Sequence, residues 1–264
     1  MYKIIIYLVV GLMSLMLKAQ VSENRKVDSF SKLKVSNTID VFYTFSDNQS
    51  IKVYTDDAQK MTCVKTEVTN DVLKIYIDTK EYFANTKRKK EKSGNNWNNG
   101  VSFKILKVEI SGPYLSEITT SASAEVKLLN ANKAKEVMLK SSSSSSIEGN
   151  FEVEKITVDA SSSSDCILML DAKTVKIESS SSSDVKISGK AEIVEVNSSS
   201  SSDCDLKNLQ AKEAYVKASS AADVMVTSTA LLNAEATSSA DVIYYGTPAK
   251  INLKESSSGS ITRK

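Results

Sequence analysis

The chain has 264 residues, with 34 Lys and Arg against 32 Asp and Glu, and its net charge of +2 gives no reason to expect a nucleic-acid-binding surface. It contains no histidine, which excludes His-based catalytic triads and most zinc sites. We therefore expect no nucleic-acid partner, no cofactor and no metal centre.

Residues 1–19 are predicted to be a signal peptide. Lys3 supplies a positive charge, residues 4–17 are apolar, and Ala19 is a small residue at the expected cut site. The apolar stretch is shorter than the roughly 20 residues that span a bilayer, so we favour cleavage over an uncleaved membrane anchor. We expect an exported protein without a transmembrane segment after cleavage, located in the periplasm, at the cell surface or outside the cell.

Residues 20–114 are predicted to form an irregular β-rich N-terminal part of the fold. Alternating apolar residues indicate strands at 50–55, 64–68, 72–78 and 101–110. Residues 33–43 already show the order of apolar strand, polar turn, Asp and strand that recurs later, which suggests an irregular first coil. Residues 84–100 are predicted to be a basic loop that carries Trp97, the only tryptophan. Trp97 is a candidate contact for a glycan or an acidic surface, although a solvated loop explains the same residues.

Residues 115–264 contain a serine-rich repeat. In each copy two alternating apolar positions precede a polar turn, and an anchor residue, usually Asp, then opens a further alternating strand. Successive anchors are separated by 18 to 21 residues. Alternation with a period of two predicts strands, and a repeat of about nineteen residues predicts one coil of a β-solenoid. The anchors are Glu125, Ser146, Asp165, Asp184, Asp203, Asp223, Asp241 and Ser260.

Two apolar columns accompany the anchors, one directly after each anchor and one seven residues before it. We therefore predict an all-β fold, a right-handed parallel β-helix whose coils stack about 4.8 Å apart. Cys166 and Cys204 share the first column two coils apart, which is too far for a disulfide, so buried free thiols are expected. The first column is Val126, Ile147, Cys166, Val185, Cys204, Val224, Val242 and Ile261, and the second is Ile118, Leu139, Val158, Ile177, Val196, Val216, Ala234 and Leu253.

Several segments resemble a family of secreted bacterial proteins, the auto-transporter adhesin head domains of the GIN type. The resemblance covers essentially the whole chain after residue 19 and rests on residues 30–43, on VLKIYI at 72–77, on PYLSEI at 113–118, on the repeats and on IYYGTP at 243–248. Members of the family usually have Gly-Ser-Gly-like turns, where this chain has Ser-Ser-Ser or Ser-Ala-Ala. The resemblance implies a secreted β-helical domain and brings no catalytic residues.

The candidate binding stripe is the column of five aspartates, Asp165, Asp184, Asp203, Asp223 and Asp241, which alternation places on the outside of the solenoid. Two roles are open. Each Asp could accept backbone N–H bonds from its serine turn, as in Asx motifs, or the column could bind a cation or a sugar. The spacing of neighbouring carboxylates also resembles that of retaining glycosidases, but an enzyme needs two carboxylates in unlike environments.

The leading hypothesis is an exported, non-catalytic protein that serves as an adhesion-like binding module or scaffold of the cell envelope, with a glycan or another envelope component as its candidate partner. One alternative is a polysaccharide-acting enzyme that uses the aspartate column, which predicts an Asp with a raised pKa in a cleft. Another is a purely structural envelope protein, which predicts a surface without hollows.

Overall fold

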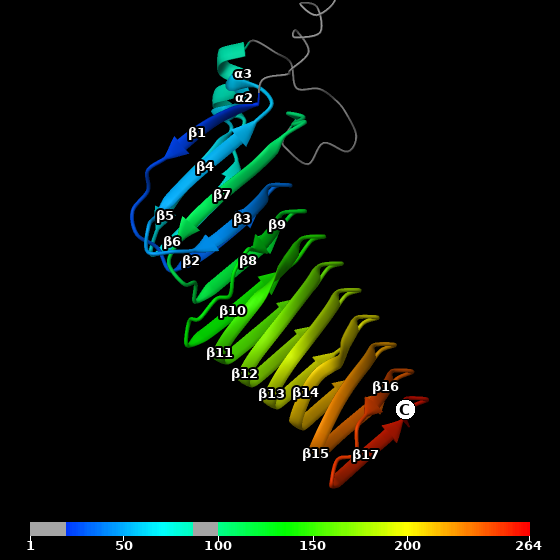
Figure 1. The fold of residues 1–264 in the computed structure, drawn as a ribbon. Coiled ribbons are helices and arrows are strands. Elements are labelled where there is room, and N and C mark those ends of the chain that lie inside the picture. The colour runs from blue at the N-terminus through cyan, green and yellow to red at the C-terminus, as the bar shows by residue number, and fades with distance from the viewer. Residues whose placement is uncertain (1–19, 87–99) are drawn as a thin grey trace, which may run out of the picture.

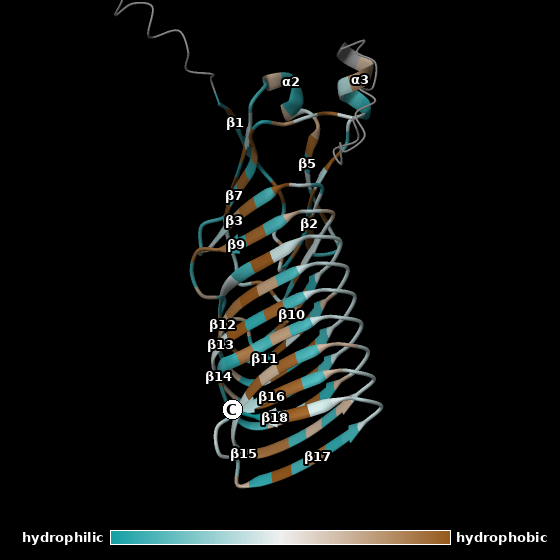
Figure 2. Cartoon of the chain, turned by 90° about the vertical axis from the view of Figure 1, so that its right-hand side faces the viewer, coloured by the Kyte–Doolittle hydropathy of each residue, from teal (hydrophilic) through white to brown (hydrophobic). Residues whose placement is uncertain are grey.

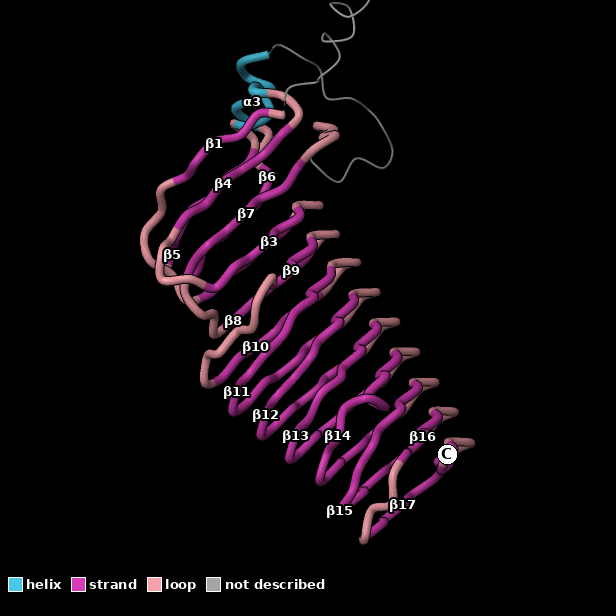
Figure 3. Tube along the Cα trace, viewed as in Figure 1, coloured by secondary structure: helices cyan, strands magenta, loops and turns pink. Residues whose placement is uncertain are grey.

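The computed structural model describes residues 20–86 and 100–264, and the predicted signal peptide lies outside them. Most of the described strands stack as parallel coils of about nineteen residues into one elongated β-solenoid (Figure 1). The all-β solenoid expected from the sequence is thus confirmed. Figure 3 shows the turns aligned along one edge of the stack.

The repeats form the regular part of the solenoid. Each of the long strands β11–β15 contributes to two layers of the solenoid. Its first half, which begins at the anchor residue, pairs with the first halves of the neighbouring strands, and its second half pairs with their second halves on the other side of the coil. We call these the anchor layer and the opposite layer. The strands are β8 (Glu117–Ser121), β9 (Glu125–Leu128), β10 (Glu136–Ser141), β11 (Ser146–Ala160), β12 (Asp165–Ser179), β13 (Asp184–Ser198), β14 (Asp203–Ala218), β15 (Asp223–Thr237), β16 (Asp241–Tyr245), β17 (Lys250–Ser256) and β18 (Ser260–Arg263).

The N-terminal part continues the stack and then covers its end. The coil formed by β2 (Lys32–Ser36) and β3 (Asp40–Phe45) stacks in parallel on β8 and β9, with Asp40 opposite Glu125. The early segment therefore forms one coil of the stack. Strands β6 (Val72–Ile77) and β7 (Leu106–Gly112) stack on its other side, while β1 (Val21–Arg25), β4 (Ser50–Thr55) and β5 (Val64–Thr69) pair antiparallel around them (Figure 1).

Two short helices, α2 (Ala58–Met61) and α3 (Lys80–Thr86), complete this end of the molecule. Residues 84–86, which the sequence analysis assigned to the loop, are the last three residues of α3. A local signal for this helix is present, because the Asp78 carboxylate accepts the backbone N–H of Lys80 at 3.0 Å, as helix-capping residues do.

Each serine turn places its two central residues in the left-handed region, as Ser181 (φ 56°) and Ser182 (φ 57°) illustrate. Residues other than glycine enter this region at a cost of about 1 kcal/mol or more. Hydrogen bonds between neighbouring turns offset that cost: the N–H of Ser182 donates to the carbonyl oxygen of Ser200 at 3.1 Å, and equivalent bonds join the turns above and below. The turns therefore form a ladder of their own along one edge, visible on the right of Figure 2.

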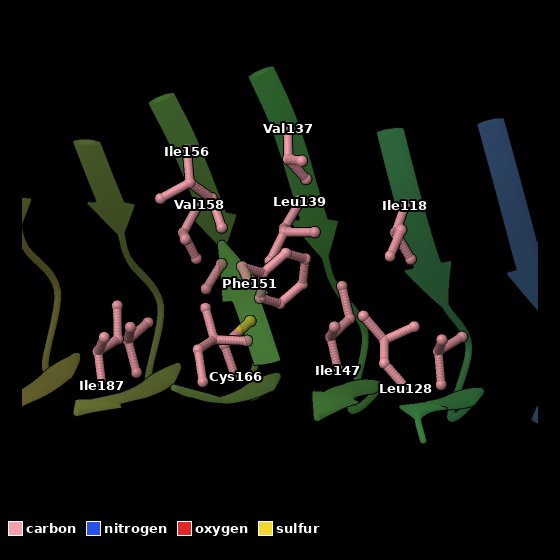
Figure 4. Close-up of a cluster of buried hydrophobic side chains, with 14 of the residues drawn as sticks. Ile118, Leu128, Val137, Leu139, Ile147, Phe151, Ile156, Val158, Cys166 and Ile187 are labelled. Carbon is pink, nitrogen blue, oxygen red and sulfur yellow. The ribbon is translucent and has the colours of Figure 1, made fainter. Parts of the chain in front are cut away.

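The core lies between the two layers and is built from the two predicted apolar columns. Every register pair of these columns is observed, and their side chains are buried apart from those of Leu253 and Ile261 in the last coil. Figure 4 shows members of both columns pointing into the same interior. The thiols of Cys166 and Cys204 are free and buried, as predicted, and burial raises the pKa of the Cys166 thiol to about 12 and that of the Cys204 thiol to about 11.

Candidate functional site

The five aspartates of the candidate stripe occupy one column of the anchor layer. Each is the direct register partner of the next, from β12 through β16, so the column crosses five coils without a gap. All five residues are exposed. The geometry thus brings the predicted residues together on one outer face, with adjacent members about 4.8 Å apart.

The stripe carboxylates have no partner within the described part of the chain, where none of them accepts a hydrogen bond or forms an ion pair. The hypothesis that each Asp accepts a backbone N–H from its serine turn is therefore wrong. In three of the five turns, the serine directly before the aspartate accepts the turn N–H instead. In one of them, the backbone N–H of Ser180 donates to the hydroxyl of Ser183 at 3.2 Å. Because this hydroxyl already holds the turn, the adjacent Asp is left free.

Mutual repulsion and partial desolvation act on the stripe. Desolvation, followed by the charge of Asp184, raises the pKa of Asp165 above its ordinary value. Asp203 has a raised pKa for the same reasons, with Asp223 as a further like charge. The stripe is thus an anionic surface that would gain from a cation or a hydrogen-bond donor placed against it.

The arrangement offers no division of catalytic roles. The five aspartates occupy equivalent positions, and neither Asp165 nor Asp203 lines a hollow formed by described residues, whereas acid–base catalysis needs carboxylates in unlike surroundings. Among residues 20–86 and 100–264, no three His, Cys, Asp or Glu side chains are grouped so as to hold a metal ion. Trp97, the other predicted contact, lies outside the described residues.

The structure also contains a groove that the sequence analysis missed. This outer groove has a volume of about 470 Å³ and lies on the outside of the opposite layer, across β13, β14, β15 and β17. Its positions could have been found from the apolar column, because the outward residues directly precede or follow Val216 and its equivalents. Apart from the pair Asn233 and Asn252, however, their identities change from coil to coil, so they gave no periodic signal. The outward lining residues are Glu195, Asn197, Tyr215, Lys217, Asn233, Glu235, Asn252 and Lys254.

Fold and surface together define a β-solenoid with a core buried between its two layers and two distinct exposed faces, the stripe and the outer groove. Residues 29–248 match the family model described as "Putative auto-transporter adhesin, head GIN domain", and the chain belongs to this family. The family and the structural neighbours are named as adhesins or binding proteins rather than enzymes.

Three solved structures share the fold. A protein titled a putative lipid binding protein from Parabacteroides distasonis superposes with a TM-score of 0.79 at 20% identity, covering 93% of this chain and 96% of its own. A putative adhesin from Parabacteroides merdae gives 0.78 at 18% identity, with coverages of 93% and 96%. A putative adhesin from Bacteroides fragilis gives 0.64 at 19% identity, with coverages of 94% and 98%. At these identities the likeness shows the fold alone.

No curated protein matches the chain. Within residues 20–86 and 100–264 the structure has no helix long and apolar enough to cross a membrane. The comparisons thus establish family and fold and leave the ligand open.

Proposed function

We propose that the protein is an exported, non-catalytic binding module of the cell envelope, which contacts a glycan or another envelope component through its exposed faces. The observation that carries the proposal is the free aspartate stripe. Five carboxylates face solvent in one column, and no described residue neutralises any of them. Like charges in direct register on neighbouring strands destabilise a sheet, so folding alone does not explain the column.

Two further observations support this function over its alternatives. The outer groove argues against a purely structural protein, for which we expected a surface without hollows. The equivalent, exposed positions of the aspartates argue against a polysaccharide-cleaving enzyme, for which one carboxylate must be kept protonated in a cleft. The names of the family and of its structural neighbours agree with a binding role.

The test is a binding measurement on residues 20–264 with a panel of purified envelope polysaccharides and glycans, with and without calcium. The variant Asp165→Asn/Asp184→Asn/Asp203→Asn removes three adjacent charges while keeping side-chain size. Thr157→Ala, an outward substitution on β11 of the opposite layer, is the matched control.

Selective binding by the unmodified protein that is lost in the triple variant and kept in Thr157→Ala would support the stripe as the contact surface. A requirement for calcium would indicate that a cation bridges the carboxylates and an acidic glycan. If no member of the panel binds, the proposed function fails. If binding is unchanged in the triple variant, the stripe is not the contact surface.

A further inference from the structure

The outer groove runs across the strands of four successive coils. One wall is the column Glu195, Tyr215, Asn233 and Asn252, and the other is the column Asn197, Lys217, Glu235 and Lys254. The backbone between the two columns, from Val196 on β13 to Leu253 on β17, forms the floor. With about 4.8 Å between coils, the groove is roughly 14 Å long. It therefore suits a narrow, extended ligand that lies along the axis of the solenoid.

Two unused amides stand one above the other in the first wall. Asn233 and Asn252 are register partners, both are exposed, and neither side chain makes a hydrogen bond to a described residue. An amide group offers one acceptor oxygen and two N–H donors. Such a group can bond two neighbouring hydroxyls of a ligand, one as donor and one as acceptor.

An aromatic ring occupies the next position of the same wall. Tyr215 is the register partner of Asn233, and its hydroxyl donates to the Glu213 carboxylate at 2.9 Å, outside the groove lining. The phenol group is thus already engaged, and the ring contributes an apolar surface to the groove. This wall of the groove therefore offers a stacking surface at Tyr215, followed by hydrogen-bonding groups at Asn233 and Asn252.

The charges of the groove cancel. Its two carboxylates and its two ammonium groups come from Glu195, Glu235, Lys217 and Lys254, and the pair Lys254–Glu235 is in contact at 2.5 Å. The carboxylates would repel a polyanion, and the ammonium groups would repel a polycation. A lipid chain would leave the free amides without partners. An uncharged ligand with many hydroxyls avoids all three penalties.

We propose that the outer groove binds a linear, uncharged oligosaccharide, with the Tyr215 ring stacking on one sugar and the Asn233 and Asn252 amides bonding the hydroxyls of the next. The inference rests on the proposed function of the protein as a binding module, but it concerns a second surface. The groove lies on the opposite layer, whereas the aspartate stripe lies on the anchor layer. The groove would suit a neutral ligand, whereas the stripe would suit a cation or a hydrogen-bond donor.

Isothermal titration calorimetry of residues 20–264 with cellohexaose, chitohexaose and a linear mannohexaose tests the proposal. We expect at least one of these neutral probes to bind. Asn233→Ala and Tyr215→Ala should each weaken binding about two- to tenfold, as the loss of one hydrogen bond or one stacking contact implies. Tyr215→Phe retains the ring and should bind like the unmodified protein. Thr157→Ala, which lies in the same outward column as Tyr215 but outside the groove, is the second control.

The outcomes separate this proposal from the proposed function. If the neutral probes bind and only the groove variants lose them, the groove is the site, whatever the triple aspartate variant does. If none of the neutral probes binds, or if binding survives Asn233→Ala and Tyr215→Ala, the groove proposal is overturned. Envelope polysaccharide binding that depends on the aspartates would still uphold the proposed function in that case. Far-UV circular dichroism of each variant confirms that the solenoid is folded.

Discussion

Removal of one buried hydroxyl from a serine turn should destabilise the solenoid more than removal of two. In the turn at residues 180–183, the Ser183 hydroxyl accepts the backbone N–H of Ser180 at 3.2 Å and donates to the Ala160 carbonyl oxygen at 3.0 Å. It also lies 2.9 Å from the hydroxyl of Ser179. Both hydroxyl-bearing residues are buried, with exposed fractions of 0% for Ser183 and 3% for Ser179.

The substitution Ser183→Ala removes these bonds and leaves the Ser179 hydroxyl without this partner in a buried place. The backbone N–H of Ser180 keeps its second acceptor, the Ala160 carbonyl oxygen at 3.0 Å. We expect a loss of about 2 kcal/mol in the free energy of unfolding, most of it from the stranded Ser179 hydroxyl.

The double variant Ser179→Ala/Ser183→Ala removes both groups and should lose only about 1 kcal/mol, because replacing both partners leaves no polar group stranded. The chain itself uses this solution in a later coil, where Ala218 and Ala222 occupy the two positions and are both buried.

Equilibrium unfolding in urea, followed by far-UV circular dichroism, provides the measurement, with Ser179→Ala completing the double-mutant cycle. The reasoning predicts that the double variant is more stable than Ser183→Ala alone. A double variant that is as unstable as Ser183→Ala, or less stable, would refute this prediction.

Further predictions concern the turns, the charges and the thiols. Ser181→Val, which places a β-branched residue at φ 56°, should lower the free energy of unfolding by about 1 kcal/mol or more, whereas Ser181→Gly should not. The raised pKa of Asp165 means that ionisation opposes folding, so Asp165→Asn should raise the urea midpoint at about pH 7, and this gain should vanish below about pH 3. Glu255→Ala removes the carboxylate that accepts the backbone N–H of Ile261 at 2.6 Å on the last coil, and sedimentation velocity should then show increased self-association. Cys166, with a pKa of about 12, should resist a thiol reagent at about pH 8 until the protein is unfolded in urea.

The register of the solenoid could be predicted because the apolar columns repeat. Val185, Cys204 and Val224 follow their aspartates at a fixed position, and a shift of one residue would turn all of them outward. The first coil was predictable for the same reason, since Asp40 is followed by Val41 just as Asp184 is followed by Val185. Burial of the free thiols followed directly from this register.

The turn chemistry and the end of the stack could not be predicted in the same way. Glycine or asparagine usually marks left-handed positions, and the pair Ser181–Ser182 gives no such signal. The Asx role expected for the aspartates failed because alternation turns their side chains outward, whereas the residue before each of them, such as Ser183, is buried against its turn. The antiparallel pairing of β4 with β7 has no counterpart in the repeat, so its position depended on contacts between segments far apart in sequence.

The groove was missed because its chemistry is not periodic. Glu195, Tyr215 and Asn233 occupy equivalent positions on successive coils, yet no two of them are alike. A search for repeats finds what folding requires in every coil, which here is the core and the turns. Residues that contact a ligand need not recur in every coil, so the apolar column indicates their positions but no repeat marks their identities.

We propose that this solenoid binds an envelope carbohydrate without altering it. The most direct test incubates residues 20–264 with purified envelope polysaccharide and separates the mixture by size-exclusion chromatography, following both the protein and the length of the polymer. The account predicts that the protein elutes with the polymer and that the polymer keeps its original length. A shortened polymer would show an enzyme, and a protein that elutes alone would show that the exposed faces do not bind it; either result would contradict the account.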